Sequence, residues 1–460
     1  MVVERGGVNG GEGSPTVVIQ GHVDMVTEKN AGSSHDFLAD PIRLMVEGDW
    51  LTADGTTLGA DNGIGVAAAL ALLDMPASSG VSIPPLECLF TVEEEIGLVG
   101  AFKLDGSMVK GRTMLNLDTV EWGSLFVGCA GGGESHITLP VEQEKVDAAL
   151  YASYRQARSI YFLEGLMGGH SGINIHEDRA NAVKLLVRVL EALSERVPSM
   201  RLVELHGGDK HNAIPREAFA TVLLPKGEEP AAFVAAARDA AELVMADLIM
   251  EFGTKEASLS VGLEGMGDEA DLCLVEDGAR RLLSLLSLLP HGVLKMSHDL
   301  DGLVETSSNL ASVAPTEATG GSEGIAYSIL CSSRSSVGPA LEEVRRRIKT
   351  TAVLCGAAGV ELPLPYPGWK PDLGSNALKV VARGSLRKLL GGREPIIAAL
   401  HAGLECGVIG DKASGMDMVS FGPTIEGAHS PDEKVDIASV GKFWQLVLAT
   451  LEGLAVPNGP

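Results

Sequence analysis

The sequence has few basic residues and no basic run. Its 36 Lys and Arg stand against 61 Asp and Glu, which gives a formal net charge of -25. Because nucleic acids are held by clustered cations, this balance argues against a nucleic-acid partner. We interpret the acidity as a solubilising surface, and attraction of divalent cations is the alternative.

A long hydrophobic run is also missing. The longest apolar segment, around residues 282–289, stops at Pro290 and is far shorter than the roughly 20 residues that cross a bilayer. The first residues, Met-Val-Val-Glu-Arg-Gly-Gly, lack the basic and then apolar regions of a secretory signal. We therefore expect no membrane partner and a cytoplasmic protein.

The cysteines show no metal-binding or disulfide spacing. None of the six occurs in a C-x-x-C pattern, so neither a disulfide framework nor a thiolate zinc site is indicated. We expect reduced core residues at Cys88, Cys129, Cys273, Cys331, Cys355 and Cys406.

What the chain does have is the composition of a folded globular protein. Apolar residues make up 45% and charged residues 21% of the 460 residues. This length predicts two or three compact units.

Short apolar runs alternate with a helical pattern near the start of the chain. Residues 16–20, 86–92 and 113–117 are rich in β-branched and apolar side chains, which is typical of buried strands. Residues 65–75 are rich in Ala and Leu and follow a glycine turn, which favours a buried helix. This alternation predicts an α/β layer with a parallel sheet.

The pattern changes in the middle of the chain. After the glycine-rich residues 128–133 it reads as strands with helices near 179–195 and 230–251, which is typical of an α+β domain. The α/β pattern returns after Tyr366, with a final helix expected at residues 440–454.

We therefore predict a domain of residues 134–364 inserted into an α/β domain of residues 1–133 and 365–460. Asn212 and Asn309 each precede an apolar pair, so two related halves within the insert remain an open alternative.

A histidine and an aspartate follow the first buried run. Residues i and i+2 of a strand point to the same face, so His22 and Asp24 are expected to share one side near the carboxyl end of the strand. Ligands of open α/β sheets gather at this edge. Asp24 could fix the tautomer of a metal-binding imidazole, although H-x-D alone is also typical of a structural histidine.

A glycine-rich loop at residues 55–65 places Asp61 just ahead of the expected helix. It has no G-x-G-x-x-G pattern, which argues against a dinucleotide site. Glu93, Glu94 and Glu95 end another buried strand, where their repulsion is costly unless cations compensate for it. A solvated acidic loop is the alternative. Adjacent residues face opposite ways, so one glutamate could bind metal while its neighbour contacts water.

Asp118 and His429 extend this set of candidate ligands. Two histidines with Asp61, Asp118 and one glutamate offer nitrogen and oxygen donors, which suit zinc, manganese or cobalt. Two divalent cations would nearly neutralise three carboxylates and a bridging hydroxide, whereas a single ion would leave the cluster strongly anionic. We therefore predict two divalent metal ions, with zinc favoured.

A series of motifs covering about residues 16–455 resembles peptidase family M20, in its aminoacyl-histidine dipeptidase branch. The motifs occur in the family's order: GHVDMV, GTTLGADNGIG, EEEIG, LNLDT, GCAGG, GGHSG, NAIPREA, ETSSNLA, RSSV, YPGWKP, HAGLECG and GAHSPDE. The resemblance implies a zinc-exopeptidase-like α/β catalytic domain with a mostly parallel central sheet, interrupted by an inserted α+β lid domain.

The resemblance also implies roles for individual residues. Asp61 would bridge two zinc ions, with Glu95 and His429 completing one coordination sphere and His22 and Asp118 the other. Asp24 would be the carboxylate beside His22, and Glu94 would be the general base, which leaves Glu93 as an extra acid. The implied substrate contacts are His170, Asn212, Arg334 and Gly403, with His170 donating to the oxyanion and Arg334 holding a free carboxylate.

The activity implied is hydrolysis of dipeptides, including Xaa-His types, by water that the metal activates. The alternatives are removal of N-acyl groups from amino acids by the same fold, or a non-catalytic scaffold derived from it. A homodimer is left open. Members of the family carry an additional segment before the GHVDMV strand, whereas only 21 residues precede His22; we expect a truncated start and reduced stability.

Overall fold

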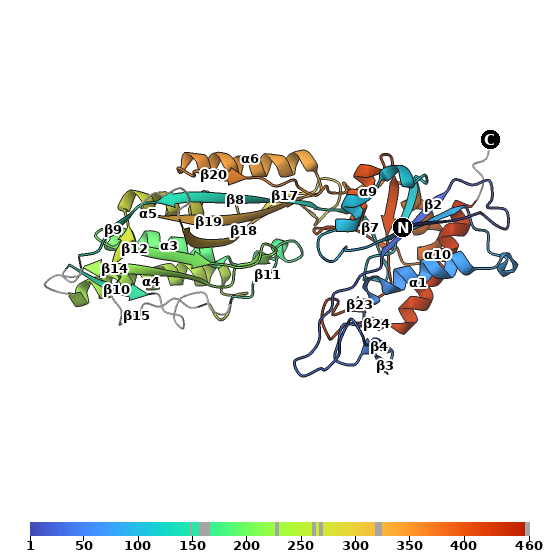
Figure 1. Cartoon of the computed structure of the whole chain (residues 1–460), viewed down its shortest axis with the longest axis horizontal. Coiled ribbons are helices and arrows are strands. Elements are labelled where there is room, and N and C mark those ends of the chain that lie inside the picture. Colours follow the sequence, from blue (N-terminus) through green and yellow to red (C-terminus); the bar gives the residue numbers. More distant parts are fainter. Residues whose placement is uncertain are drawn as a thin grey trace. The chain divides into compact units, whose positions relative to one another are not determined.

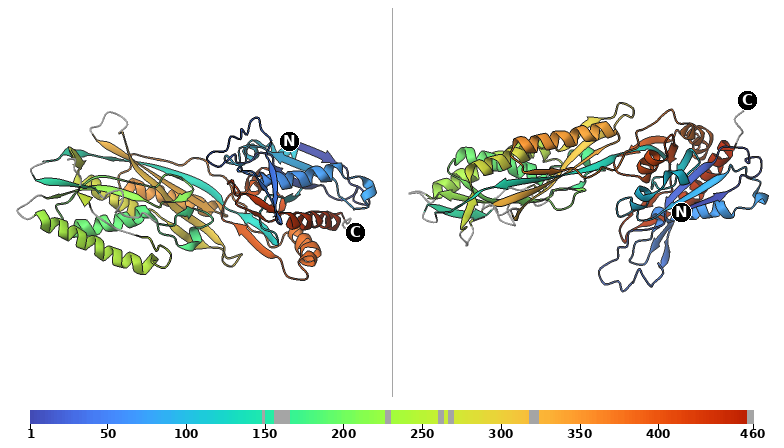
Figure 2. Two further views of the ribbon diagram at one scale, coloured as in Figure 1. Left: turned by 90° about the horizontal axis from the view of Figure 1, so that it is seen from below. Right: turned by 45° about the horizontal axis from the view of Figure 1, so that its top comes forward.

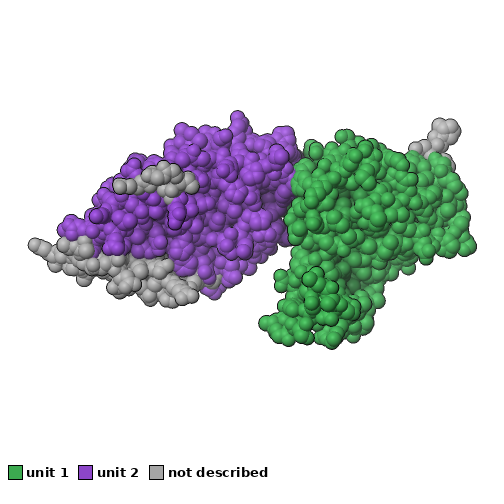
Figure 3. All heavy atoms as spheres, viewed as in Figure 1, with its two compact units in different colours: residues 1–130, 367–460 green, residues 131–366 purple. Residues whose placement is uncertain are grey.

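Two compact units make up the chain. The computed structural model describes residues 1–147, 150–155, 166–225, 230–259, 264–265, 270–317 and 324–455. Unit 1 comprises residues 1–130 and 367–460, and unit 2 comprises residues 131–366 (Figure 3).

Unit 1 is built on a mostly parallel sheet. Its strand order is β1-β5-β2-β6-β22-β7-β21. Figure 1 labels two of these strands, β2 and β7. The strands are β1 (Val2–Arg5), β2 (Val17–His22), β5 (Leu86–Thr91), β6 (Thr113–Asn116), β7 (Ser124–Cys129), β21 (Ile396–Leu400) and β22 (Asp417–Ser420). Strands β5, β2, β6 and β22 are parallel, while β1 runs antiparallel to β5 and β7 antiparallel to β22. Every residue of β2 and β5 is buried, which explains why both strands are mostly apolar.

Helices cover the sheet of unit 1. They are α1 (Ala60–Asp74), α2 (Val99–Lys103), α7 (Asn376–Lys379), α8 (Arg387–Leu389), α9 (Glu405–Lys412) and α10 (Ile437–Leu454). Helix α1 packs on β2 and β5, and α9 packs on β7 and α2. Figure 1 shows α1 and α10 beside one another. The predicted helix began at residue 65, but α1 begins at Ala60, with Asp61 and Asn62 outside helical geometry.

A smaller antiparallel sheet in unit 1 has the order β23-β24-β4-β3. Its strands are β3 (Leu44–Glu47), β4 (Trp50–Ala53), β23 (Ile425–Glu426) and β24 (Lys434–Asp436). The loop between β23 and β24 carries His429, and the chain enters α1 shortly after β4. This sheet therefore carries the segments that flank Asp61 and His429.

Unit 2 is an α+β unit with an antiparallel sheet. In its described residues the order is β15-β10-β14-β12-β18-β19-β8-β20, with β17 also paired to β18. The strands are β8 (Gly131–Val141), β10 (Tyr151–Arg155), β12 (Arg201–Gly207), β14 (Ala218–Pro225), β15 (Glu264–Gly265), β17 (Gly292–Met296), β18 (Val304–Glu317), β19 (Ile325–Ser335) and β20 (Gly359–Glu361). Short pairs join β9 (Gln143–Lys145) to β16 (Leu272–Leu274), and β11 (Gly169–His170) to β13 (Ala213–Ile214).

Four helices share one apolar core with this sheet. They are α3 (Ala182–Arg196), α4 (Pro230–Phe252), α5 (Glu276–Leu288) and α6 (Gly338–Leu354). Helix α6 runs along the strands it covers (Figure 2). In α3 the residues Val183, Leu186, Leu190 and Leu193 recur at helical spacing and are buried in this core. Strands β12 and β18 meet through the pair Gly207↔Val313, and the two related halves stay a prediction.

Candidate metal centre and substrate contacts

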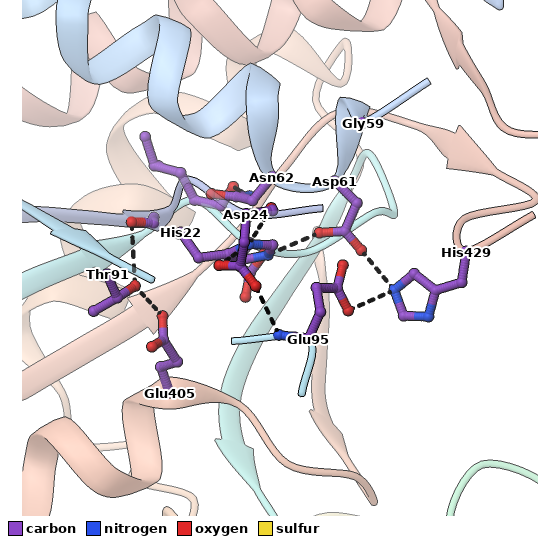
Figure 4. A network of polar contacts seen from close by, with 12 residues as sticks. His22, Asp24, Gly59, Asp61, Asn62, Thr91, Glu95, Glu405 and His429 are labelled. Atoms are coloured by element: carbon purple, nitrogen blue, oxygen red, sulfur yellow. Dashed lines mark hydrogen bonds and ion pairs between the residues drawn. The ribbon is translucent and has the colours of Figure 1, made fainter. Parts of the chain in front are cut away.

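Five candidate ligands converge at the carboxyl edge of the unit 1 sheet. His22 ends β2, Glu95 follows β5, and Asp118 follows β6. Because these strands are parallel, their carboxyl ends lie at one edge of the sheet. Asp61 at the start of α1 and His429 in the β23–β24 loop reach the same place (Figure 4).

Asp61 lies between two groups of ligand atoms. Its Oδ1 is 3.3 Å from Nε2 of His22, and its Oδ2 is 3.4 Å from Nε2 of His429. Asp118 Oδ1 lies 3.3 Å from the same nitrogen of His22, and Glu95 Oε2 lies 3.2 Å from that of His429. The donor atoms of each triad, His22–Asp61–Asp118 and Asp61–Glu95–His429, lie within 4.8 Å of one another.

Burial and the close contacts between histidines and carboxylates shift the pKa values of these residues. Burial opposes the charged form of His22, yet Asp118 and Asp61 together raise its pKa to about 12. Asp61 and Glu95 raise the pKa of His429 to about 10. Burial raises the pKa of Asp118 to about 7. The carboxylates thus use the two histidines as their positive partners.

The donor set fits divalent cations. No Lys or Arg of the described residues forms an ion pair with Asp61, Glu95 or Asp118. Oε1 of Glu95 is buried and has no hydrogen-bond partner. Buried carboxylates need compensating charge, and nitrogen and oxygen donors without thiolate suit zinc, manganese or cobalt.

Asp24 lies beside His22, and its main chain and carboxylate have separate partners. Nδ1 of His22 is 2.9 Å from the main-chain oxygen of Asp24 and 3.6 Å from its carboxylate Oδ1. The other carboxylate oxygen accepts the N–H of Glu95 at 3.1 Å. The carbonyl therefore orients the imidazole, while the carboxylate holds the loop that carries the glutamates.

The three glutamates of that loop have different surroundings. Glu93 is exposed and has a left-handed backbone with φ 56°. Its Oε2 lies 3.8 Å from Nζ of Lys103. Glu94 shares a group of close donor atoms with His22 and Glu95. Burial, together with the nearby charges of Asp118 and Glu95, raises the pKa of Glu94 to about 9. Glu94 is thus a basic carboxylate inside the cluster.

Three of the expected substrate contacts lie in unit 2. Nδ1 of His170 accepts the N–H groups of Gly172 and Ile173 at 3.1 and 3.0 Å, so the ring proton resides on Nε2. Burial, together with the nearby charges of Arg334 and His211, lowers the pKa of His170 to about 4. His170 is therefore a neutral N–H donor at neutral pH.

Arg334 is a buried cation on β19. Its Nη1 donates to the hydroxyl of Tyr366 at 2.8 Å, and its Nε has no partner. Gly132 lies opposite Arg334 in the sheet, and a Cβ there would come within 2.4 Å of that hydroxyl. Asn212 lies near β13, and its main-chain oxygen accepts the N–H of Ser171 at 2.8 Å. Gly403 belongs to unit 1, between β21 and α9.

Two buried carboxylates at the metal edge were not assigned from the sequence. Glu433 accepts the N–H groups of Leu58, Gly59 and Asp61 at 2.7, 2.8 and 3.2 Å, and thereby fixes the loop before α1. Glu405 accepts hydrogen bonds from Gln20 and Thr91. Both occur within quoted motifs, GAHSPDE and HAGLECG, but only the fold reveals their partners.

Comparison with known proteins identifies the family. Cytosol non-specific dipeptidase of Escherichia coli (strain K12) is 38% identical over 452 residues, which cover 98% of this chain and 88% of that protein. The chain belongs to peptidase family M20. A family model described as a peptidase dimerisation domain matches residues 162–247 of this M20 protein.

Solved structures agree with the M20 fold. Aminoacylhistidine dipeptidase from Vibrio alginolyticus superimposes with a TM-score of 0.84 at 38% identity, covering 100% of this chain and 88% of that one. An aminopeptidase from Bacillus cereus has a TM-score of 0.59 at 16% identity, covering 99% and 84%, and shares the fold. The predicted family and fold class are confirmed. M20 is a family of metallopeptidases, and the described residues include three groups of His, Asp and Glu that could hold a metal ion.

In the part of the chain that the structure describes, no helix has the length and apolar character needed to cross a bilayer.

Proposed function

We propose that this M20 protein hydrolyses dipeptides, including Xaa-His dipeptides, with two divalent metal ions. The observation that carries the proposal is the position of Asp61, whose two carboxylate oxygens face two separate histidines. One ion would be held by His22, Asp61 and Asp118, and the other by Asp61, Glu95 and His429. Zinc is favoured, with manganese and cobalt as alternatives.

Glu94 is the proposed general base. When bound, divalent ions polarise a carbonyl and increase the acidity of water. Glu94 would accept a proton from the attacking water and return it to the nitrogen of the leaving amine. Asp24 would assist by holding the N–H of Glu95, which fixes the adjacent Glu94. The carboxylate of Glu94 lies among the cluster donors, which supports this role.

The residues of unit 2 would bind and orient the substrate. The Nε2–H of His170 is proposed to donate to the carbonyl oxygen as negative charge develops on it. Arg334 would bind the free carboxylate of the dipeptide, since a guanidinium forms paired hydrogen bonds with a carboxylate. Its unpartnered Nε supports this role. Asn212 and Gly403 are proposed as further substrate contacts.

We also propose the arrangement of the larger molecule. Residues 134–364 would act as an inserted lid on a catalytic domain of residues 1–133 and 365–460. The match to a peptidase dimerisation domain at residues 162–247 supports a homodimer. The name of the Escherichia coli relative supports a cytoplasmic location.

A metal reconstitution assay tests the proposed function. The purified chain is stripped with a chelator, and hydrolysis is measured as zinc, manganese or cobalt is restored. The substrates are dipeptides including Xaa-His, tripeptides and N-acetyl amino acids. We expect dipeptides to be cleaved fastest and activity to saturate at two ions per chain. Preference for N-acetyl amino acids would indicate an amidohydrolase, and metal binding without turnover would indicate a scaffold.

A further inference from the structure

A row of buried polar side chains crosses four neighbouring strands of the unit 1 sheet near their carboxyl ends. Each of the four neighbouring parallel strands β5, β2, β6 and β22 contributes one member. The members are Thr91, Gln20, Asn116 and Ser420, and each is at most 4% exposed. Strands buried on both faces are normally apolar throughout, so a polar side chain on each of four adjacent strands calls for a function.

A chain of hydrogen bonds links this polar row to one carboxylate. Ser420 donates to Asn116, whose amide donates to Gln20. Gln20 Nε2 then donates to Oε2 of Glu405 at 2.6 Å. Thr91 Oγ1 donates to the same oxygen at 2.6 Å (Figure 4). Hydrogen bonds in series polarise one another. The row therefore presents strengthened donors to Glu405, which stabilises the ionised carboxylate.

The polar row lies directly behind the metal ligands. Gln20 is two residues before His22, and the period of a strand puts both side chains on one face. Asn116 is two residues before Asp118, and Thr91 is three residues before Glu94. The side chains that meet at Glu405 therefore come from the same strands that deliver the metal cluster.

Glu405 is a buried carboxylate without a cation of its own. It is 0% exposed, and its Oε1 has no hydrogen-bond partner. Among the described residues, no Lys or Arg forms an ion pair with it. Such a charge is costly to bury unless positive charge lies nearby. The carboxylate does interact electrostatically with His22 and Asp118, which places it within reach of the field of bound ions.

We propose that Glu405 is a positioning residue that, through the polar row, fixes the strands carrying the metal ligands and raises the affinity of the centre for divalent ions. This inference rests on the proposed dinuclear centre. Glu405 adds a negative charge behind Asp61, Glu95 and Asp118, and nearby negative charge favours the binding of divalent cations. Residues that support metal ligands from outside typically change affinity by about 10–100-fold when replaced.

The test compares metal affinity in Glu405→Gln with that in a matched control, Glu87→Gln. Glu87 is a second carboxylate of unit 1, 2% exposed, at the opposite end of β5, where it accepts the N–H groups of Lys110 and Gly111. Each chelator-stripped variant is titrated with zinc and with manganese by calorimetry and by competition with a chromogenic chelator. We expect about 10–100-fold weaker binding in Glu405→Gln and unchanged binding in Glu87→Gln.

A milder variant covers the case in which Glu405→Gln folds poorly. Thr91→Val keeps the shape of the side chain and removes one of the two donors to Glu405, so its metal affinity should fall by a smaller factor. Equal affinity in wild type, Glu405→Gln and Thr91→Val would overturn the inference. So would an equal loss in Glu405→Gln and Glu87→Gln, because that would report general destabilisation.

The same titrations separate this inference from the proposed function. If the wild-type chain binds no ions, the dinuclear proposal itself fails. If the wild type binds two ions and hydrolyses dipeptides while Glu405→Gln binds them equally well, only the role of Glu405 is rejected.

Discussion

Single residues carry the chemistry of this protein, and Asp61 is the central one. Its two oxygens face His22 and His429, so one carboxylate belongs to both triads. Around it, the carbonyl of Asp24 orients His22, and the carboxylate of Glu433 fixes the main chain of the loop before α1. Small displacements of these groups would therefore affect both halves of the proposed centre.

Replacing Glu94 separates metal binding from catalysis. Glu94→Gln keeps the size of the side chain but removes the group that accepts the proton. We expect two ions per chain by elemental analysis and a fall in kcat of about 100- to 10,000-fold, the usual contribution of a general base. The control is Glu93→Gln, because Glu93 is exposed beside Lys103. Wild-type turnover in Glu94→Gln would reject the assignment.

Replacing Arg334 tests the carboxylate anchor. Arg334→Ala should raise KM for dipeptides about 10- to 100-fold, since hydrogen bonds to charged groups are worth about 1.5–3 kcal/mol. The same dipeptides with an amidated C-terminus should be affected far less. Steady-state kinetics on both series provide the measurement. An equal effect on free and amidated dipeptides would show that Arg334 does not bind the carboxylate.

The sequence predicted the ligands of the site better than the residues that hold them. His22, Asp61, Glu95, Asp118 and His429 occur in recognisable patterns, and all five converge. No such pattern reveals the partners of the buried carboxylates that support these ligands. Glu405 contacts Gln20, 385 positions away in the sequence, and Glu433 contacts Leu58, 375 positions away. Such contacts depend on tertiary packing, which no local pattern encodes.

The secondary-structure elements position the site, because the metal ligands lie at the ends of strands, in the loops that follow them or, for Asp61, at the start of α1. The strands expected at residues 16–20, 86–92 and 113–117 correspond to β2, β5 and β6, whose apolar runs are buried on both faces. The start of α1 was predicted five residues late, because the glycine-rich loop hides the non-helical turn at Asp61. No strand was predicted at β17 in unit 2. The residues of β17 are mostly exposed, and its pairing with β18 contains register shifts.

We expect the stability of the chain to depend on pH because of His291, which lies between α5 and β17. Burial, with Lys184 nearby, lowers the pKa of His291 from 6.5 to about 4. The folded chain thus holds this histidine neutral, and the unfolded chain binds a proton below pH 6.5. Its contribution to stability is complete above pH 6.5 and is lost as the pH falls toward 4, by up to about 3 kcal/mol.

Urea unfolding of the wild type and His291→Gln between pH 7 and pH 4.5 measures this contribution. The free energy of unfolding should fall less steeply with acidification in His291→Gln than in the wild type. The control, His298→Gln, changes an exposed histidine of the same unit. Parallel pH profiles for the wild type and His291→Gln would contradict the prediction.

At the scale of the whole molecule, metal binding and folding are linked in unit 1. The ligands come from residues 22 to 429 of the chain, so they meet only in the folded state. Anything that binds the folded chain alone stabilises it, by about 2.7 kcal/mol at a ligand concentration one hundred times Kd.

Chelator treatment should therefore lower the Tm of unit 1 by several degrees, and restoring zinc should recover it. Differential scanning calorimetry measures this change, with magnesium as the control cation because it prefers oxygen ligands in an octahedral geometry. The transition of unit 2, which contains none of the five proposed ligands, should remain unchanged. A Tm that is insensitive to both chelator and zinc would mean that the cluster binds no ion tightly.

The most direct test of the account is the anomalous scattering of a zinc-loaded crystal. A dinuclear centre predicts two peaks about 3.5–4 Å apart, one on each side of the Asp61 carboxylate, with His22 and Asp118 around one and Glu95 and His429 around the other. A single peak, or peaks away from these five side chains, would contradict it.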